Sequence, residues 1–158
     1  MAKPTKNATL ICLVLSAVAA AGIVLGFVTE EIMWPIGLLV PTVAYEAYRT
    51  EGASTRWASW TLAALMVALI VVVLFDIDYD LRQLFGSGAA YIGGEDVPLG
   101  DVKVVFPAAM AVLAAVLWSR TRGIYTRWLA AIIFVTAAVI VYLRAPADLT
   151  NLLNTTVG

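Results

Sequence analysis

Five apolar stretches alternate with short polar segments along the chain, and this alternation is its dominant pattern. The stretches cover residues 8–28, 32–48, 57–75, 102–118 and 128–143. A helix needs about 20 apolar residues, with a range of about 17–25, to cross a bilayer. The first stretch meets this length, and the others lie near its lower limit. Aromatic residues, which favour the membrane interface, stand at several of their ends. The pattern therefore predicts five membrane-spanning helices.

The composition is that of a membrane protein. Of the 158 residues, 62% are hydrophobic and 13% are charged, whereas soluble domains average about 45–50% and about 25%. We therefore predict one all-α integral membrane bundle over residues 1–158. The net charge of −1 gives no sign of a nucleic-acid partner. The chain has no histidine and a single cysteine, Cys12. This excludes histidine-ligated haem, the usual zinc sites and a disulfide framework.

The basic residues predict which side of the membrane each segment faces. With five spans and the N-terminus inside, seven basic residues lie in inner segments and three in outer segments, as the positive-inside rule expects. The inner residues are Lys3, Lys6, Arg49, Arg56, Arg120, Arg122 and Arg127, and the outer residues are Arg82, Lys103 and Arg144. We therefore predict a bacterial or archaeal cytoplasmic-membrane protein with its N-terminus inside and its C-terminus outside.

One nine-residue sequence occurs twice, 71 positions apart. RTEGASTRW (49–57) and RTRGIYTRW (120–128) share six of their nine residues. Each copy joins two predicted helices on the inner side. Arg49 and Arg120 suit the end of a helix at the cytoplasmic surface, and Trp57 and Trp128 suit the membrane interface.

The remaining residues of the repeat favour a helix–turn–helix connection. The glycines are expected to turn the chain past a helix end and the threonines to cap the next helix; these residues are Gly52, Gly123, Thr55 and Thr126. Upstream, MWP (33–35) and VFP (105–107) place Pro35 and Pro107 in the expected first turns of the preceding helices.

The repeat predicts an internal duplication. The chain would consist of one N-terminal helix and two related helical hairpins, 32–75 and 102–143, with the same orientation in the membrane. Such parallel repeats are related by an axis along the membrane normal. The alternative is that two unrelated loops converged on the residues that favour helix ends.

An acidic, glycine-rich segment, residues 76–101, lies between the predicted hairpins on the outer side. Asp76, Asp78 and Asp80 alternate as in the first half of a calcium-binding loop, but the glycine and distal glutamate of that motif are absent. A solvated acidic rim is the simplest interpretation, with cation binding or docking of an external protein as alternatives. Residues 144–158 are expected to form an external tail.

Glu46 is the only acid inside a predicted span, and an ionisable residue within a membrane is a candidate functional residue. Arg49 follows one helical turn later, so we expect an ion pair with Arg49 or extension to the inner surface. Proton transfer is the alternative. Pro41 is expected to kink the same span. The sequence contains no nucleophile–base pair, phosphate-binding loop or metal cluster, which predicts a non-catalytic protein without a cofactor.

The order of elements resembles the small membrane subunit of tripartite tricarboxylate transporters, the TctB type. The shared features are one helix, an aromatic–proline-led helix, a basic turn, a Trp-led helix and a second such hairpin. That family's GPxFFP-like motif corresponds to TEEIMWPIG (29–37), which keeps an aromatic residue and Pro35. TEEIMW and AYEAYRTEG (44–52) also loosely resemble the Trp-Glu-Glu helix of the small subunit of TRAP transporters, although the span count fits that family less well.

These resemblances imply a non-catalytic small subunit that works with a large permease and an external solute-binding protein. Small residues in 16–22 and 107–115 would let helices approach closely, either within the chain or against a partner. Two other classes remain open from the sequence. One is a structural subunit of an energy-converting or photosynthetic membrane complex, and the other is a small self-assembling channel or carrier.

Overall fold

The computed structural model describes residues 7–50, 53–77, 91–92, 95–96 and 101–144. These residues form helices α1 (Ala8–Thr29), α2 (Met33–Arg49), α3 (Ala53–Leu74), α5 (Val102–Arg120) and α6 (Ile124–Arg144). Two short strands, β1 (Tyr91–Ile92) and β2 (Glu95–Asp96), pair in antiparallel orientation. The predicted class, an all-α bundle of a membrane protein, is confirmed.

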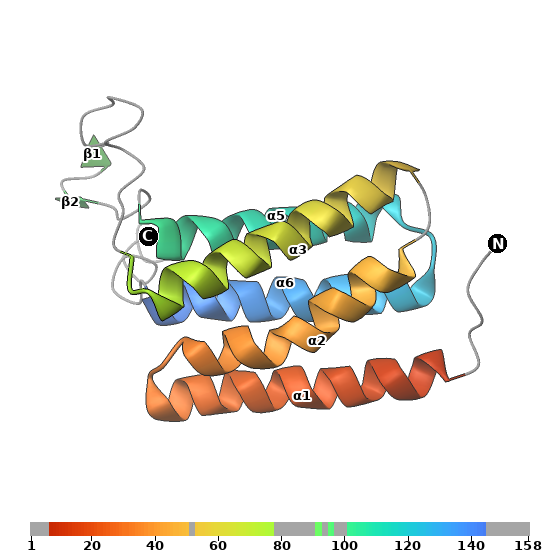
Figure 1. The fold of residues 1–158 in the computed structure, drawn as a ribbon, viewed down its shortest axis with the longest axis horizontal. Helices are drawn as coiled ribbons and strands as arrows, with labels where there is room; N and C mark the ends of the chain where they lie inside the picture. Colours follow the sequence, from red (N-terminus) through yellow and green to blue (C-terminus); the bar gives the residue numbers. More distant parts are fainter. Residues whose placement is uncertain (1–6, 51–52, 78–90, 93–94, 97–100, 145–158) are drawn as a thin grey trace, which may run out of the picture.

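The five helices lie side by side, and each runs in the opposite direction to the one before it (Figure 1). The α2–α3 and α5–α6 connections therefore meet at one end of the bundle, together with the start of α1. We call this the basic end, because it holds Arg49, Arg56, Arg120, Arg122 and Arg127. The opposite end is the acidic end, with Glu30, Glu31, Asp76 and Asp101.

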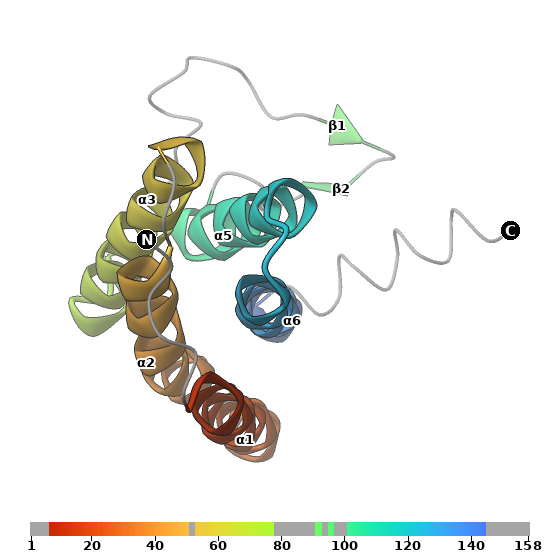
Figure 2. The same ribbon diagram turned by 90° about the vertical axis from the view of Figure 1, so that its right-hand side faces the viewer.

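Among the described residues, four helical segments are long and apolar enough to cross a membrane. They are Ala8–Thr29, Thr55–Leu74, Val102–Arg120 and Ile124–Arg144. Helix α2 has 17 residues, which is the lower limit of the spanning range of about 17–25 residues. It nevertheless runs antiparallel to α1 and packs against α1, α3 and α6 (Figure 2). The chain thus passes along the bundle five times, as the sequence predicts.

The core lies among the four helices of the two hairpins. Its fully buried residues include Leu39 on α2, Leu69 on α3, Met110 on α5 and Ile140 on α6. Apolar surface covers both the inside and the outside of this bundle, so close van der Waals packing, more than the hydrophobic effect, must hold the helices together in lipid.

Helix α1 packs on this bundle through small residues. A Cβ atom at Gly22 would lie 3.0 Å from Leu38 Cβ, and one at Gly26 would lie 2.9 Å from Pro35 Cδ. Both glycines therefore allow α1 and α2 to approach closely, and any larger residue at these positions would push the two helices apart. Small residues of the N-terminal helix thus serve packing within the chain.

The two hairpins correspond to each other at the 71-residue offset of the repeated sequence. Helices α2 and α5 end at Arg49 and Arg120, and helices α3 and α6 begin at Ala53 and Ile124. The residues that follow α2 and α5, Thr50 and Thr121, are both extended, and each donates its backbone N–H to the carbonyl four residues earlier. The two copies of the repeat therefore end their helices in the same way.

The buried positions correspond as well. On α2 and α5, the fully or nearly fully buried pairs include Leu39 with Met110 and Val43 with Ala114; on α3 and α6, they include Leu62 with Ile133, Met66 with Ala137 and Leu69 with Ile140. In the repeat, α6 corresponds to α3, and α2 corresponds to α5. Helix α3 packs on α5, and in the same way α6 packs on α2. This exchange of contacts is what a two-fold axis along the bundle produces, so the arrangement supports duplication over convergence.

Some local predictions for the repeat are wrong. Thr55 and Thr126 do not cap helices, because α3 and α6 begin two residues before them. Gly123 lies directly before α6 and accepts from the N–H of Arg127; α5 is already ended by the extended Thr121. Pro107 is the sixth residue of α5, not a first-turn residue, because that helix begins at the Asp101 cap. Gly52 lies outside the described residues.

Candidate functional site

A buried carboxyl group lies between the two helices of the first hairpin, near the basic end. Glu46, in the last turn of α2, is 0% exposed. Its Oε1 atom accepts a hydrogen bond from Thr50 Oγ1 at 2.6 Å and another from Ser59 Oγ, on α3, at 2.9 Å. Because α2 and α3 are antiparallel, the short turn between them brings Glu46 and Ser59 to the same level. We call Thr42, Glu46, Thr50 and Ser59 the glutamate site.

Two of the five side-chain oxygen atoms of this site have no hydrogen-bond partner. Glu46 Oε2 and Thr42 Oγ1 are both buried, and neither has a hydrogen-bond partner. Thr42 precedes Glu46 by four residues, so the two side chains lie on the same face of α2. A buried polar atom without a partner is costly and usually has an explanation.

The predicted ion pair between Glu46 and Arg49 is not formed. The Arg49 guanidinium donates to Tyr45 Oη at 3.3 Å and lies 4.8 Å from the centre of the Tyr125 ring, on α6. Tyr125 is in turn hydrogen-bonded to Thr9, on α1, at 2.8 Å. Arg49 therefore joins α2 to α6 and α1, while Glu46 faces α3. Full burial of Glu46 also excludes the predicted extension of its side chain to the inner surface.

The second hairpin has an apolar version of the same site. At the 71-residue offset, Leu117 corresponds to Glu46 and Ala130 to Ser59, and both are buried. Thr121 corresponds to Thr50, but its buried Oγ1 has no hydrogen-bond partner, because Leu117 offers no carboxylate. The polar chemistry thus belongs to only one of two hairpins that pack alike.

The other residues singled out in the sequence are not gathered at the glutamate site. Pro35 is buried against Gly26 of α1, Pro107 is buried within α5, and Pro41 is exposed inside α2, which continues past it. Trp57 is 78% exposed, whereas Trp128 donates its indole N–H to Ser16, on α1, at 2.9 Å. Arg120 is exposed at the basic end.

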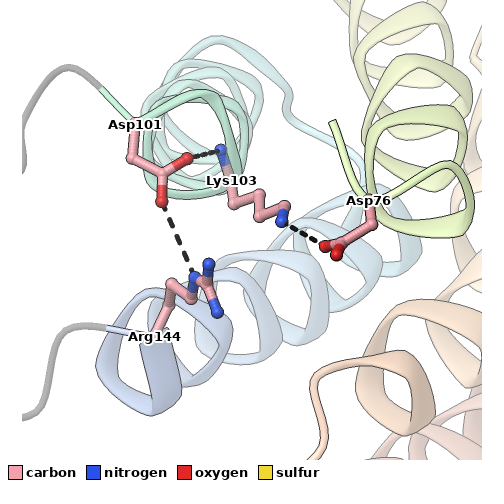
Figure 3. Close-up of polar contacts among 4 residues, drawn as sticks. All are labelled: Asp76, Asp101, Lys103 and Arg144. Atoms are coloured by element: carbon pink, nitrogen blue, oxygen red, sulfur yellow. Dashed lines mark hydrogen bonds and ion pairs between the residues drawn. The ribbon is translucent and has the colours of Figure 1, made fainter. Parts of the chain in front are cut away.

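A second polar cluster joins three helices at the acidic end (Figure 3). Lys103, in the first turn of α5, is only 3% exposed, so it does not reach freely into water. Its Nζ atom donates to Asp76 Oδ1, just beyond α3, at 2.7 Å. Asp101 caps α5 by accepting from the Lys103 N–H at 2.9 Å, and its other oxygen lies 3.6 Å from Arg144 Nε, on α6. These contacts tie α3, α5 and α6 together at the acidic end.

Asp76 is therefore a partner of Lys103, which argues against its use as a free cation ligand. The hydrogen bond from Lys103 and the positive charge of Lys103 lower the pKa of this aspartate. Asp78 and Asp80 lie outside the described residues. Within the parts of the chain that the structure describes, no three His, Cys, Asp or Glu residues are placed to hold a metal ion.

An apolar groove of about 320 Å³ lies between α5 and α6. Its lining residues are Ala114, Ala115, Trp118, Ala130, Ala131, Phe134 and Val135. The alanine-rich sequence of the fourth span was the signal for a close helix approach here. The sequence did not reveal that alanines from two helices form one continuous floor.

These features define an integral membrane bundle whose described residues form one N-terminal helix, two like hairpins and the buried glutamate site. No known protein family, characterised protein or solved structure matches the chain. Its function must therefore be inferred from the arrangement of its own residues.

Proposed function

We propose that this chain is a non-catalytic membrane subunit that assembles with a larger integral membrane protein. The observation that carries the proposal is the apolar groove between α5 and α6. We propose further that the complex is a solute transporter with a permease-like partner, as the resemblance to small transporter subunits implies.

The floor of the groove is suited to a transmembrane helix of the partner. Four alanines, Ala114, Ala115, Ala130 and Ala131, form it, and Trp118 and Phe134 lie beside them. Small residues let two helix backbones approach closely, and such van der Waals packing is what drives helix association in lipid. The groove is open on its membrane-facing side, so a bulky side chain of a partner helix can enter between α5 and α6.

The charges of the bundle favour one orientation for this subunit. The five arginines of the basic end belong on the cytoplasmic side by the positive-inside rule. The acidic end, with Glu30, Glu31 and Asp101, would then face outward. An external solute-binding protein would meet this acidic surface.

The test is to fill the groove without touching the core. Ala115 is exposed on α5, and Ala115→Phe puts a ring on the groove floor. Ala64→Phe, at an exposed position of α3 away from the groove, is the matched control. We expect a multi-span membrane protein to co-purify stoichiometrically with the wild type and with Ala64→Phe after mild-detergent extraction from native membranes. Mass spectrometry should show its loss with Ala115→Phe. Retention of the partner by Ala115→Phe would contradict the proposal.

One observation favours a second candidate, a small carrier that works without a partner. Glu46 is buried and is not neutralised by Arg49, which is typical of a coupling residue more than of a structural charge. Reconstitution of the purified chain alone into proteoliposomes separates the two candidates. Transport by the chain alone would favour the carrier, and transport only after addition of the partner would favour the subunit.

A further inference from the structure

The glutamate site contains two buried oxygen atoms that have no hydrogen-bond partner among the described residues. Glu46 Oε1 lies within hydrogen-bond distance of two hydroxyl groups, those of Thr50 and Ser59, and each hydroxyl also lies near a backbone carbonyl of its own helix. Glu46 Oε2 has no donor, and Thr42 Oγ1 has no partner. One proton on Oε2 makes it a donor. Thr42 Oγ1, one turn earlier on the same helix face, is the acceptor that a rotation of either side chain would bring to it.

We propose that Glu46 is a reversible proton-binding site, with the proton held on Oε2 and donated to Thr42 Oγ1. Burial without a counter-ion favours the neutral acid, because an ionised carboxylate at this position would be a buried, unpaired charge. The proposal concerns the first hairpin and does not depend on a partner at the α5–α6 groove.

The charged and titratable groups around the site do not replace this proton. On α2, Arg49 donates to Tyr45, and its guanidinium lies over the ring of Tyr125, on α6. Arg56, on α3, is exposed, and Arg127, on α6, donates to the backbone carbonyl of Thr121. Cys12, on α1, packs near Tyr45. The ion pairs formed among the described residues join Lys103 to Asp76 and Arg144 to Asp101. Glu46 is thus without a counter-ion there, and a buried carboxyl in that situation takes up a proton.

A proton suits the site better than a metal cation. Metal ions such as Ca²⁺ need about six to eight oxygen ligands, and Mg²⁺ needs about six. Here Oε1 of Glu46 already faces the protons of two hydroxyl groups, those of Thr50 and Ser59. Among the described residues, no group of three or more His, Cys, Asp or Glu side chains is placed to hold a metal ion.

Protonation of Glu46 would control the contact between α2 and α3. A hydrogen bond from Ser59 to Glu46 links these two helices near the basic end. Loss of the proton leaves a charge in an apolar seam, and that charge is relieved only by water or by a rearranged cation.

Infrared spectroscopy of the purified full-length chain in lipid bilayers tests the proposal directly. At about pH 7, solvated carboxyl groups are ionised, so a carbonyl-stretch band of a protonated carboxylic acid should come from Glu46. We expect this band in the wild type and in Asp76→Asn, and its loss in Glu46→Gln. Thr42→Val should shift the band by removing its hydrogen-bond acceptor. Thr136→Val should leave it unchanged, because Thr136 is a buried threonine bonded to its own helix backbone.

A second variant keeps the test decisive if Glu46→Gln does not fold. The double substitution Glu46→Leu with Ser59→Ala reproduces the apolar pair that the second hairpin already uses at this position, and the band should be absent from it. Absence of the band from the wild type, or its persistence in both Glu46 variants, would overturn the proposal. A band that does not respond to Thr42→Val would overturn the assignment of Thr42 as the acceptor.

Discussion

The hairpins α2–α3 and α5–α6 share their orientation, their helix-ending geometry and most of their buried positions, but they differ in one layer near the basic end. The first hairpin places Glu46 against Ser59, and the second has Leu117 and Ala130 in their places. Because the apolar pair supports the same packing, the fold itself does not require a glutamate. The comparison indicates that Glu46 serves a role beyond folding.

The two hairpins also differ in what covers them. Helix α1 packs on α2 and α6, and among the described residues no helix covers α3 and α5 in the equivalent way (Figure 2). The tryptophans of the repeat show the consequence. Trp128 is hydrogen-bonded to Ser16 of α1, whereas Trp57 is 78% exposed. The tryptophan of the repeat thus contacts another helix in one copy and is exposed in the other.

The largest effect is expected when the second hairpin receives the carboxyl group of the first. Leu117→Glu buries a carboxyl opposite Ala130, where Thr121 is the one hydroxyl placed like Thr50. We expect a loss of about 2–7 kcal/mol in the free energy of unfolding, the cost of burying a polar group without enough hydrogen bonds. Titration with a denaturing detergent in mixed micelles measures it. Adding Ala130→Ser should recover about 1 kcal/mol through one hydrogen bond. Wild-type stability of Leu117→Glu would show that the two layers do not differ as described.

A smaller loss is expected where α1 meets the first hairpin. Gly22→Ala places a Cβ 3.0 Å from Leu38 Cβ and 3.3 Å from Pro35 Cα, so the helices must separate. Overpacking of this kind costs about 1–3 kcal/mol. Gly37→Ala, on α2, is the matched control, because its Cβ would meet nothing within 4 Å; it should stabilise the helix by about 0.5–1 kcal/mol. The same detergent titration compares them, and equal effects of the two substitutions would contradict the close α1–α2 contact.

Much of this architecture could be predicted from the sequence, because helix length, basic loops and an internal repeat are properties of short segments. Five helices, their order and the related hairpins follow from those signals. The apolar stretches predicted from residues 57 and 128 begin too late, because α3 and α6 start at Ala53 and Ile124. The first turns of both helices contain polar residues, so the apolar pattern does not include them.

The environment of Glu46 could not be predicted in the same way. Its partner Ser59 is on another helix, so their contact depends on how α2 and α3 rotate against each other. The spacing along α2 favoured Arg49 as the partner of Glu46, but Arg49 instead stacks on Tyr125 of α6. Burial of Lys103 likewise depends on the packing of three helix ends.

The smallest effect is expected at the acidic end, where Asp76 of the first hairpin meets Lys103 of the second. Lys103 lowers the pKa of Asp76 below its usual value of 3.8. The stability from this contact is therefore present above pH 3.8 and is lost as the pH falls through the lower, folded-state pKa. Wild type should lose slightly more thermal stability than Asp76→Asn between about pH 7 and about pH 2. Asp76 is largely solvent-exposed, so the difference should be small. An identical loss in both proteins would show that the contact contributes nothing.

The most direct test of the duplicated five-pass bundle is the labelling of single cysteines from each side of the membrane. In a Cys12→Ala background, Glu31→Cys reports the α1–α2 turn, Ser54→Cys the start of α3 and Ser119→Cys the end of α5. With an impermeant maleimide on right-side-out vesicles, we expect Glu31→Cys to react at once. Ser54→Cys and Ser119→Cys should react only after permeabilisation. Reaction of Ser54→Cys from the same side as Glu31→Cys would show that α2 does not cross. Reaction of Ser54→Cys and Ser119→Cys from opposite sides would show that the hairpins are not parallel copies.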